Sequence, residues 1–182
     1  DKCVKAGKIR FCGLSNETPW GVNEYLRLAK LYDLPVMTSV QNEFSLLHTI
    51  DWPYMMETCS LNNVAYLPWS PLAGGALSGK YMGGARPMGS RWRASQRLGL
   101  FRVTPRGDAA IAAYVAVAER YDLTAAQLAL AWVDQVDGVS SIILGATSEK
   151  QLRENIDAFN MPLSSECIVD IAGVLKNHPL TF

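Results

Sequence analysis

The stretch VAYLPWSPLAGG, residues 64–75, contains the pattern on which the fold of this 182-residue chain depends. Its first half, residues 64–69, is a short apolar run of the kind that forms a buried strand, and its second half is rich in polar residues and glycine. Similar apolar runs occupy residues 9–14, 36–40 and 139–144, and polar residues follow each of them. We therefore predict four strands, each of which ends at a polar turn.

Signals for helices separate the predicted strands. Thr18 and Thr104 each precede a proline, a combination typical of a helix N-cap followed by the first helical residue. Asp51 is expected to cap a helix that runs to about residue 61, and Ser148 with Gln151 is expected to form a capping box. Strands that alternate with helices indicate parallel βα units. Four such units fit either an open α/β sheet or half of an eight-stranded barrel, and periodicity does not distinguish the two.

The composition excludes several classes of function. Lys and Arg together number 17, as do Asp and Glu, so the chain offers no basic field for nucleic acid. The four cysteines are widely spaced and the two histidines lie far apart, which argues against a zinc or other His-based metal site. Unpaired cysteines suit a reducing compartment, of which the cytoplasm and the plastid stroma are the leading candidates. No apolar run reaches the roughly 20 residues that a transmembrane helix needs.

Polar or glycine residues after the four predicted strands suggest a binding site. The carboxyl ends of parallel strands share one face of a sheet, which is where ligands bind in α/β proteins. The start of the helix near residue 148 would favour an anion such as phosphate. The residues in question after the strands are Ser15, Asn16, Gln41, Asn42, Ser70, Pro71, Leu72, Ala73, Gly74, Gly145 and Thr147.

Each of these features also fits an ordinary structural role. Turns and helix caps use the same residue types, and Trp69 suits a core as well as a stacking surface for a flat ring. The glycine-rich stretch from Gly74 to Gly89 is predicted to be a functional or mobile loop, on which Lys80 and Arg91 would be solvated or would contact a phosphate ester. The coincidence of such residues at every strand end favours a site.

Four ordered segments resemble the aldo-keto reductase family. They are GKIRFCGLSN at residues 7–16, VQNEFS at 40–45, WSPLAGGALSGKY at 69–81, and ILGAT at 143–147 with QLRENI at 151–156. Within that family they are similar to the branch of the bacterial Tas-like proteins, plant plastid proteins and potassium-channel β subunits. The resemblance implies an (α/β)8 TIM barrel that uses NADP(H) to reduce a small carbonyl substrate.

The resemblance also implies that residues 1–182 correspond to the second half of the barrel, strands five to eight with their helices. The catalytic Asp, Tyr, Lys and His of the family lie in the first half, so no residue here matches them. The chain alone is therefore expected to be inactive. One departure from the family pattern is Pro68, where a small residue is common before the aromatic residue.

The residues that match the family are those of its cofactor site. By resemblance, Ser15, Asn16 and Gln41 hold the nicotinamide carboxamide, and Trp69 lies under the nicotinamide ring. The turn over the pyrophosphate comprises Ser70, Pro71, Leu72, Ala73 and Gly74, with Lys80 and Arg91 above the phosphates. The adenosine and 2′-phosphate end would be held by Gly145, Thr147, Gln151, Glu154 and Asn155.

An isolated half barrel would expose two sheet edges, which favour pairing with another chain. Three arrangements are open: a full reductase of which this is the C-terminal part, a dimer of two halves, or a structural subunit docked on a larger assembly. The first function hypothesis is accordingly an NADP(H)-dependent reductase. The alternative is a non-catalytic structural or regulatory subunit.

Overall fold

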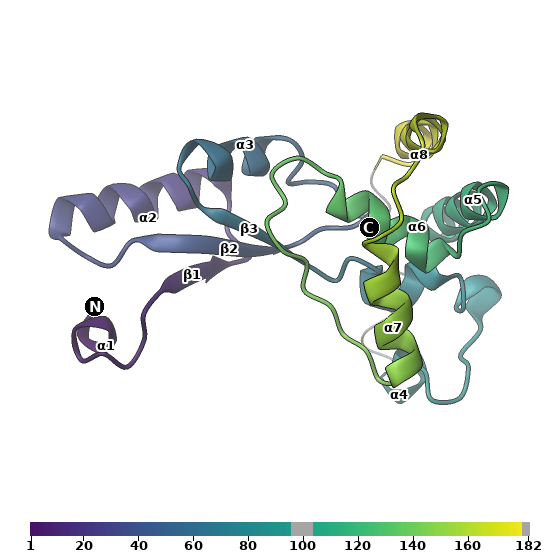
Figure 1. The fold of residues 1–182 in the computed structure, drawn as a ribbon, viewed down its shortest axis with the longest axis horizontal. Coiled ribbons are helices and arrows are strands. Elements are labelled where there is room, and N and C mark those ends of the chain that lie inside the picture. The colour runs from purple at the N-terminus through teal and green to yellow at the C-terminus, as the bar shows by residue number, and fades with distance from the viewer. Residues whose placement is uncertain (96–103, 180–182) are drawn as a thin grey trace.

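A parallel three-stranded sheet organises the first part of the chain in the computed structural model, which describes residues 1–95 and 104–179. The strands are β1 (Cys12–Ser15), β2 (Met37–Glu43) and β3 (Ala65–Trp69), in the spatial order β1-β2-β3. Helices α2 (Pro19–Tyr32) and α3 (Tyr54–Leu61) connect them and lie on the same face of the sheet (Figure 1). A short helix, α1 (Lys2–Lys5), precedes β1. The prediction of parallel βα units is confirmed for these three strands.

The predicted fourth strand at residues 139–144 is wrong as a regular strand. The segment lies parallel to β3 but forms only isolated bridges, from Val139 to Tyr66 and from Ile143 to Trp69. Two features of β3 explain the interruption. The Tyr66 amide donates to the Ser140 hydroxyl at 3.2 Å instead of to a backbone carbonyl. Pro68 has no N–H to donate, although its carbonyl accepts from the Ile143 amide at 2.8 Å.

Four longer helices gather at the other end of the molecule (Figure 1). They are α5 (Pro105–Arg120), α6 (Ala125–Asp134), α7 (Glu149–Ala158) and α8 (Ser165–Asn177). The threonine caps predicted for α2 and α5 are confirmed, since Thr18 accepts from the Gly21 amide at 3.1 Å and Thr104 from the Gly107 amide at 2.9 Å. Thr124 caps α6 in the same way, and the side chain of Gln127, the third residue of that helix, completes a capping box by bonding back to Thr124.

Two predicted caps differ in the structure. Asp51 does not cap α3, because its carboxylate instead accepts hydrogen bonds from the Tyr66 hydroxyl and the Asn42 amide, each at 2.8 Å. Ser148 does accept from the Gln151 amide at 3.3 Å. The Gln151 side chain, however, accepts from the amide and hydroxyl of Thr147, so the reciprocal bond of a capping box to Ser148 is not made.

The glycine-rich stretch after β3 is more ordered than the predicted loop. It contains two 3-10 helices, η1 (Ala73–Ser78) and η2 (Met82–Gly84), and is followed by the one-turn helix α4 (Arg91–Ala94). The prediction of a mobile loop does not fit this part of the chain, because Ala76, Leu77 and Tyr81 are buried in the core. These few apolar side chains are enough to anchor a segment that is otherwise polar.

The core joins the sheet to the helical end. Phe44, directly after β2, stacks on Trp132 of α6 with ring centres 5.5 Å apart and meets the edge of Tyr66 at 6.1 Å. Tyr114 of α5 is buried as well, and its hydroxyl donates to the Leu46 carbonyl at 3.1 Å. Burial raises the pKa of the Tyr114 hydroxyl, which therefore stays protonated. The segment directly after β2 thus rests on α5 and α6.

Candidate cofactor-binding site

Four of the predicted residues come together where the strands end. We call Ser15, Asn16, Gln41 and Trp69 the strand-end cluster. The Asn16 amide N–H donates to the Gln41 carbonyl at 3.0 Å, which extends the β1–β2 ladder by one bond. The Asn16 side chain donates to the Ser15 hydroxyl and accepts from the Trp69 indole N–H, both at 3.2 Å. Residues from all three strands therefore meet at one point, as predicted.

Strand register explains how these residues meet. Ser15 pairs with Gln41 across β1 and β2, and Glu43 pairs with Trp69 across β2 and β3. Asn16 then turns the chain toward α2 with a φ of +54°, a left-handed conformation that Asn tolerates better than most residues. The cluster presents a hydroxyl, two amides and a half-buried indole, which is the set of groups that a planar aromatic amide would need for hydrogen bonding and stacking.

The turn after Trp69 has an unusual backbone. Ser70, Ala73, Gly74 and Gly75 all have positive φ angles, and the Ala73 amide closes a tight turn onto the Ser70 carbonyl at 2.7 Å. Pro71 and Ala73 are buried, so within the predicted pyrophosphate turn these two offer only backbone groups to a ligand. A Cβ on Gly74 would lie 3.5 Å from the Trp92 indole nitrogen, which shows how closely α4 approaches the turn.

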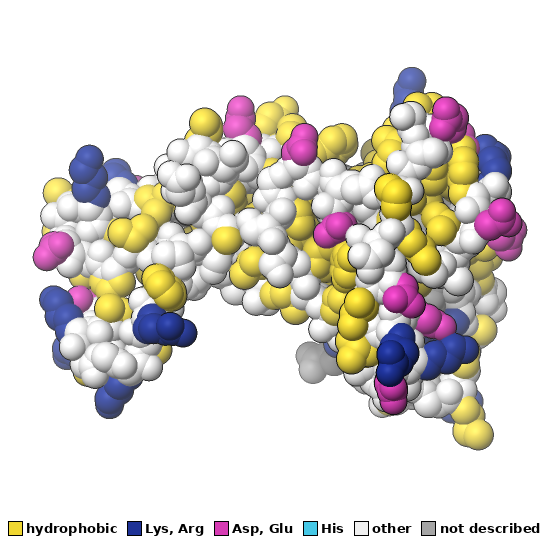
Figure 2. Space-filling model, viewed as in Figure 1, with side chains coloured by type: hydrophobic (Ala, Val, Ile, Leu, Met, Phe, Trp, Pro, Cys, Tyr) yellow, Lys and Arg dark blue, Asp and Glu magenta, His cyan; other side chains and the backbone are white. Residues whose placement is uncertain are grey.

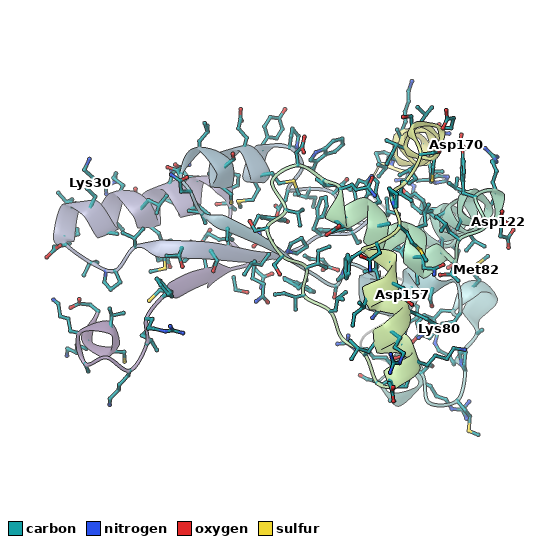
Figure 3. The ribbon with its side chains drawn as sticks, viewed as in Figure 1. Lys30, Lys80, Met82, Asp122, Asp157 and Asp170 are labelled. Atoms are coloured by element: carbon teal, nitrogen blue, oxygen red, sulfur yellow. The ribbon has the colours of Figure 1, made fainter. Side chains whose placement is uncertain are left out.

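Lys80 lies beside this turn, as predicted. Its ammonium is 5.2 Å from the centre of the Tyr81 ring and would be 3.6 Å from a Cβ on Gly75. Figure 3 labels Lys80 at the helical end of the molecule. Arg91 is exposed at the start of α4. The role predicted for Arg91 above the phosphates stays a prediction.

Arg86 also lies in this region, although it is not among the residues predicted from the sequence. Its guanidinium lies 5.3 Å from the Trp92 ring and 5.9 Å from the Tyr81 ring, and the two rings stack 4.1 Å apart with their planes within 2°. An arginine between two aromatic residues in a glycine-rich segment was the available signal, because Arg packs well on aromatic faces. Arg86 thus adds a second cation near Lys80.

The residues predicted to hold the adenosine end of the cofactor differ in how exposed they are. We call residues 145–155 the helix-end segment. Gly145, Thr147, Gln151 and Glu154 are exposed, whereas Asn155 is only 6% exposed. Two of them make local contacts: the Gln151 side chain accepts hydrogen bonds from Thr147, and the Glu154 carboxylate lies 3.8 Å from the Lys150 ammonium. The bond from the Ile143 amide to the Pro68 carbonyl brings the start of this segment beside the end of β3.

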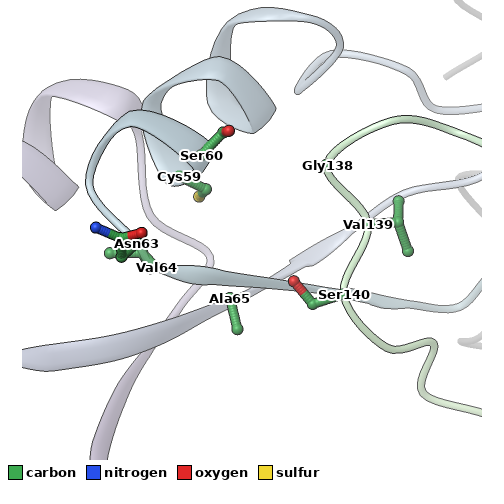
Figure 4. A pocket seen from close by; sticks show the side chains of 8 residues that line it. All are labelled: Cys59, Ser60, Asn63, Val64, Ala65, Gly138, Val139 and Ser140. Carbon is green, nitrogen blue, oxygen red and sulfur yellow. The ribbon is translucent and has the colours of Figure 1, made fainter.

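An open depression of about 410 Å³ lies at the opposite end of β3 from Trp69 (Figure 4). None of the predicted cofactor residues lines it. Burial, with a further contribution from the Asp51 charge, raises the pKa of the Cys59 thiol to about 11, so this cysteine is not a reactive thiolate. The residues that line the depression are Cys59, Ser60, Asn63, Val64, Ala65, Gly138, Val139 and Ser140.

Residues 1–95 and 104–179, the part of the chain that the structure describes, contain neither a metal-binding cluster nor a membrane-spanning helix. Among them no three His, Cys, Asp or Glu side chains are grouped so that they could hold a metal ion. In the same part of the chain, no helix has both the length and the apolar character needed to cross a membrane.

Comparison with known proteins gives a consistent result. Residues 1–176 match the model of the aldo/keto reductase family. The chain is 40% identical over 170 residues to protein tas of Escherichia coli K12, covering 93% of this chain and 49% of that protein. It is 30% identical over 164 residues to a probable voltage-gated potassium channel subunit beta of Arabidopsis thaliana, covering 88% of this chain and 48% of that protein. It is 29% identical over 162 residues to L-glyceraldehyde 3-phosphate reductase of E. coli K12, covering 86% of this chain and 46% of that protein.

The chain therefore spans about half the length of these relatives. The matched region includes the strand-end cluster, the turn after Trp69 and the helix-end segment. The four sequence segments and the family match over residues 1–176 agree with each other. The chain belongs to the aldo/keto reductase family, whose fold is of the α/β TIM-barrel type.

Proposed function

We propose that this chain supplies the cofactor-binding half of an NADP(H)-dependent reductase of small carbonyl compounds. The observation that carries the proposal is the strand-end cluster, in which three strands bring a hydroxyl, two amides and an indole ring to one point. When bound, NADPH supplies the hydride that reduces a carbonyl carbon. The residues of this chain bind and orient it.

At the nicotinamide end, the proposed contacts follow from side-chain chemistry. Ser15, Asn16 and Gln41 would hydrogen-bond the carboxamide, which has both a donor and an acceptor group. Trp69 would stack on the ring, and the bond from its indole N–H to Asn16 at 3.2 Å limits rotation of the indole. Holding the ring in one orientation lowers the entropy cost of reaching the reactive geometry.

At the phosphates, the proposal relies on charge and bare backbone. Lys80 lies beside the turn at Gly74 and Gly75, whose positive φ angles suit glycine and whose backbone carries no side chain of its own. Arg91, with Arg86, would add positive charge on the same side. Together with Ser70, Pro71, Leu72 and Ala73, these residues form the proposed pyrophosphate site.

At the adenosine end, the N-terminus of the ten-residue helix α7 would attract the 2′-phosphate through its free amide groups. Gly145 and Thr147 precede that helix, and Gln151 and Glu154 are exposed on its first turns. Asn155 is buried at the same level, so its proposed role is to support this end from beneath.

The proposed reductase also needs a second half of the barrel, which would bring the catalytic Asp, Tyr, Lys and His that the family carries. Two observations support this. The chain spans about half the length of its relatives, and within the described residues β1 pairs with β2 alone, so that its other edge is unpaired there. Apolar side chains are exposed close to that edge, including Phe11 at 73% and Val36 at 56%. Figure 2 shows apolar side chains along the concave margin of the molecule.

A second candidate function is a non-catalytic structural or regulatory subunit of a protein assembly. The observation that favours it is the 30% identity to a probable potassium channel subunit beta. Both candidates share the NADP(H) site, so binding of the cofactor does not separate them. Turnover by the intact protein does.

The test has two parts. The purified 182-residue chain, incubated with NADPH and a reactive aldehyde, should oxidise no more NADPH than a blank without protein. The same chain expressed together with the first half of the E. coli tas protein should gain NADPH oxidation, and the mixture lacking either half should not. Turnover by the chain alone would contradict the proposal that this chain binds the cofactor while the other half carries the catalytic residues. An intact protein that binds NADPH but reduces no aldehyde would favour the subunit alternative.

A further inference from the structure

Asn42, on the helix-facing side of β2, contacts the chain directly after the strand-end cluster. Its side-chain amide donates to the Glu17 carbonyl at 2.7 Å, and its side-chain oxygen accepts from the Glu17 amide at 3.0 Å. Both backbone groups of Glu17 are therefore held by one side chain that is 6% exposed. Glu17 immediately follows Asn16, the central residue of the cluster.

A carboxylate fixes which way the Asn42 amide points. The second hydrogen of its NH2 group is donated to Asp51 at 2.8 Å. An ionised carboxylate can only accept, so Asn42 must present its NH2 group to Asp51 and to the Glu17 carbonyl, which leaves its oxygen for the Glu17 N–H. The hydroxyl of Tyr66 donates to the same Asp51 oxygen at 2.8 Å and links the network to β3.

The network does for Glu17 what a neighbouring strand would do. The backbone ladder between β1 and β2 ends with the bond from the Asn16 amide to the Gln41 carbonyl. Asn16 then turns away with a positive φ, and the Asn42 side chain takes over the bonding that the ladder no longer provides. Asn16 is thus fixed on both sides, by Gln41 before the turn and by Asn42 after it.

We infer that Asn42, oriented by Asp51, is a positioning residue that sets the place of Asn16 at the nicotinamide end of the cofactor site. This inference rests on the proposed function, because it gives Asn42 a role in that same site. Asn42 itself is buried behind Glu17, so it acts through Asn16 without touching the ligand. Its effect should be confined to one end of the cofactor.

The experiment compares two ligands on variants of the intact protein. NADPH carries the nicotinamide, whereas 2′,5′-ADP carries the adenosine end without it. For Asn42→Ser, whose shorter side chain cannot hold both groups of Glu17, affinity for NADPH should fall about tenfold, which corresponds to roughly 1.4 kcal/mol. Affinity for 2′,5′-ADP should stay within about twofold, because hydrogen bonds contribute locally.

Thr38→Val is the matched control. The Thr38 hydroxyl also joins β2 to β1, by donating to the Cys12 carbonyl at 3.1 Å, but it does so at the amino end of the strands. This variant should leave the affinity of both ligands within about twofold of the wild type. A general loosening of the sheet would instead affect both variants and both ligands.

Asp51→Asn provides a second test that does not depend on the folding of Asn42→Ser. It removes the charge that orients Asn42 and should weaken NADPH by about threefold with 2′,5′-ADP unchanged. Circular dichroism checks that each variant is folded. Equal losses of both ligands, or no loss of NADPH in either variant, would overturn the inference while leaving the proposed function standing. A wild-type protein that binds neither ligand would overturn both.

Discussion

The strand-end cluster and the helix-end segment would serve one cofactor, yet they are held in different ways. In the cluster, the hydrogen bonds from Asn16 to Gln41 and from Trp69 to Asn16 join residues that are 25 and 53 positions apart in the chain. In the helix-end segment, the bonds between Thr147 and Gln151 join residues four positions apart. The first is therefore fixed by the sheet and its core, whereas the second depends on the start of α7. Changes in the core should affect the cluster through stability, and changes in α7 should affect binding alone.

The largest effect is expected from Trp132→Ala, which removes the ring stacked on Phe44, whose amide donates to the carbonyl of Trp69 in the cluster. The Trp132 side chain is 6% exposed and stacks on Phe44 at 5.5 Å. Loss of a buried aromatic side chain leaves a cavity and should lower the free energy of unfolding by about 3–5 kcal/mol. Urea denaturation measures this change.

Trp20→Ala is the matched control for that change. Trp20 is 75% exposed, so its loss should alter the free energy of unfolding by no more than about 0.5 kcal/mol. Equal destabilisation by the two variants would show that the cluster does not rest on α6.

Gln151→Ala tests the helix-end segment. Its bonds to Thr147 are exposed, so stability should change by less than about 1 kcal/mol. Affinity for 2′,5′-ADP should nevertheless fall by about fivefold to tenfold, because the variant removes a proposed contact and releases Thr147. Isothermal titration calorimetry gives the affinity. A loss of stability as large as that of Trp132→Ala would erase the contrast between the two regions.

Trp69→Phe should have a smaller effect on stability than Trp132→Ala, and it tests one hydrogen bond within the cluster. Phenylalanine keeps an aromatic face but cannot donate to Asn16, a bond of 3.2 Å in the structure. The free energy of unfolding should fall by about 0.5–1.5 kcal/mol, the usual contribution of one hydrogen bond. NADPH should bind more weakly while 2′,5′-ADP binds as before. Unchanged NADPH affinity would argue against a role for the indole N–H.

The smallest effect concerns the packing of α5 against α8. The Tyr121 hydroxyl donates to Asp170 at 2.8 Å, and this bond, together with Arg120, holds the pKa of the Asp170 carboxyl below its usual value. The unfolded chain therefore binds this proton more readily. The resulting stability is present above the unfolded pKa of about 3.9 and is lost as the pH falls through the folded pKa.

Asp170→Asn should remove this contribution. Its unfolding midpoint should fall less steeply than that of the wild type as the pH is lowered below about 4, as followed by thermal melts across that range. A wild type and a variant with parallel pH profiles would show that the ion pair and the hydroxyl contribute nothing measurable.

Much of the fold could be predicted from local sequence signals. The first three apolar runs became strands, and Thr18 and Thr104 became caps, because each depends only on a few neighbouring residues. The fourth run failed as a strand since its partner β3 carries Pro68 and donates from Tyr66 to a side chain. Such a failure depends on two segments at once, which a single apolar pattern does not report.

The candidate site was predicted partly through position and partly through resemblance. That Ser15, Asn16, Gln41 and Trp69 would converge follows from parallel strands, whose carboxyl ends share one face. The role of Asn42 and Asp51 could not be predicted. Asp51 is a typical helix cap by sequence, and its actual partners are 9 and 15 positions away. Arg86 was missed because its aromatic neighbours are brought together only by the folding of the glycine-rich segment.

The stacked rings of Tyr81 and Trp92 make the position of the segment between them optically readable. The two rings are parallel at 4.1 Å and both are buried, so they form a rigid chromophore pair that contributes to near-ultraviolet circular dichroism. The pair exists only while residues 82–91 are folded back onto η1. Any ligand that lifts this segment would separate the rings and move Trp92 into water. Opening could thus be followed in real time without attaching a label.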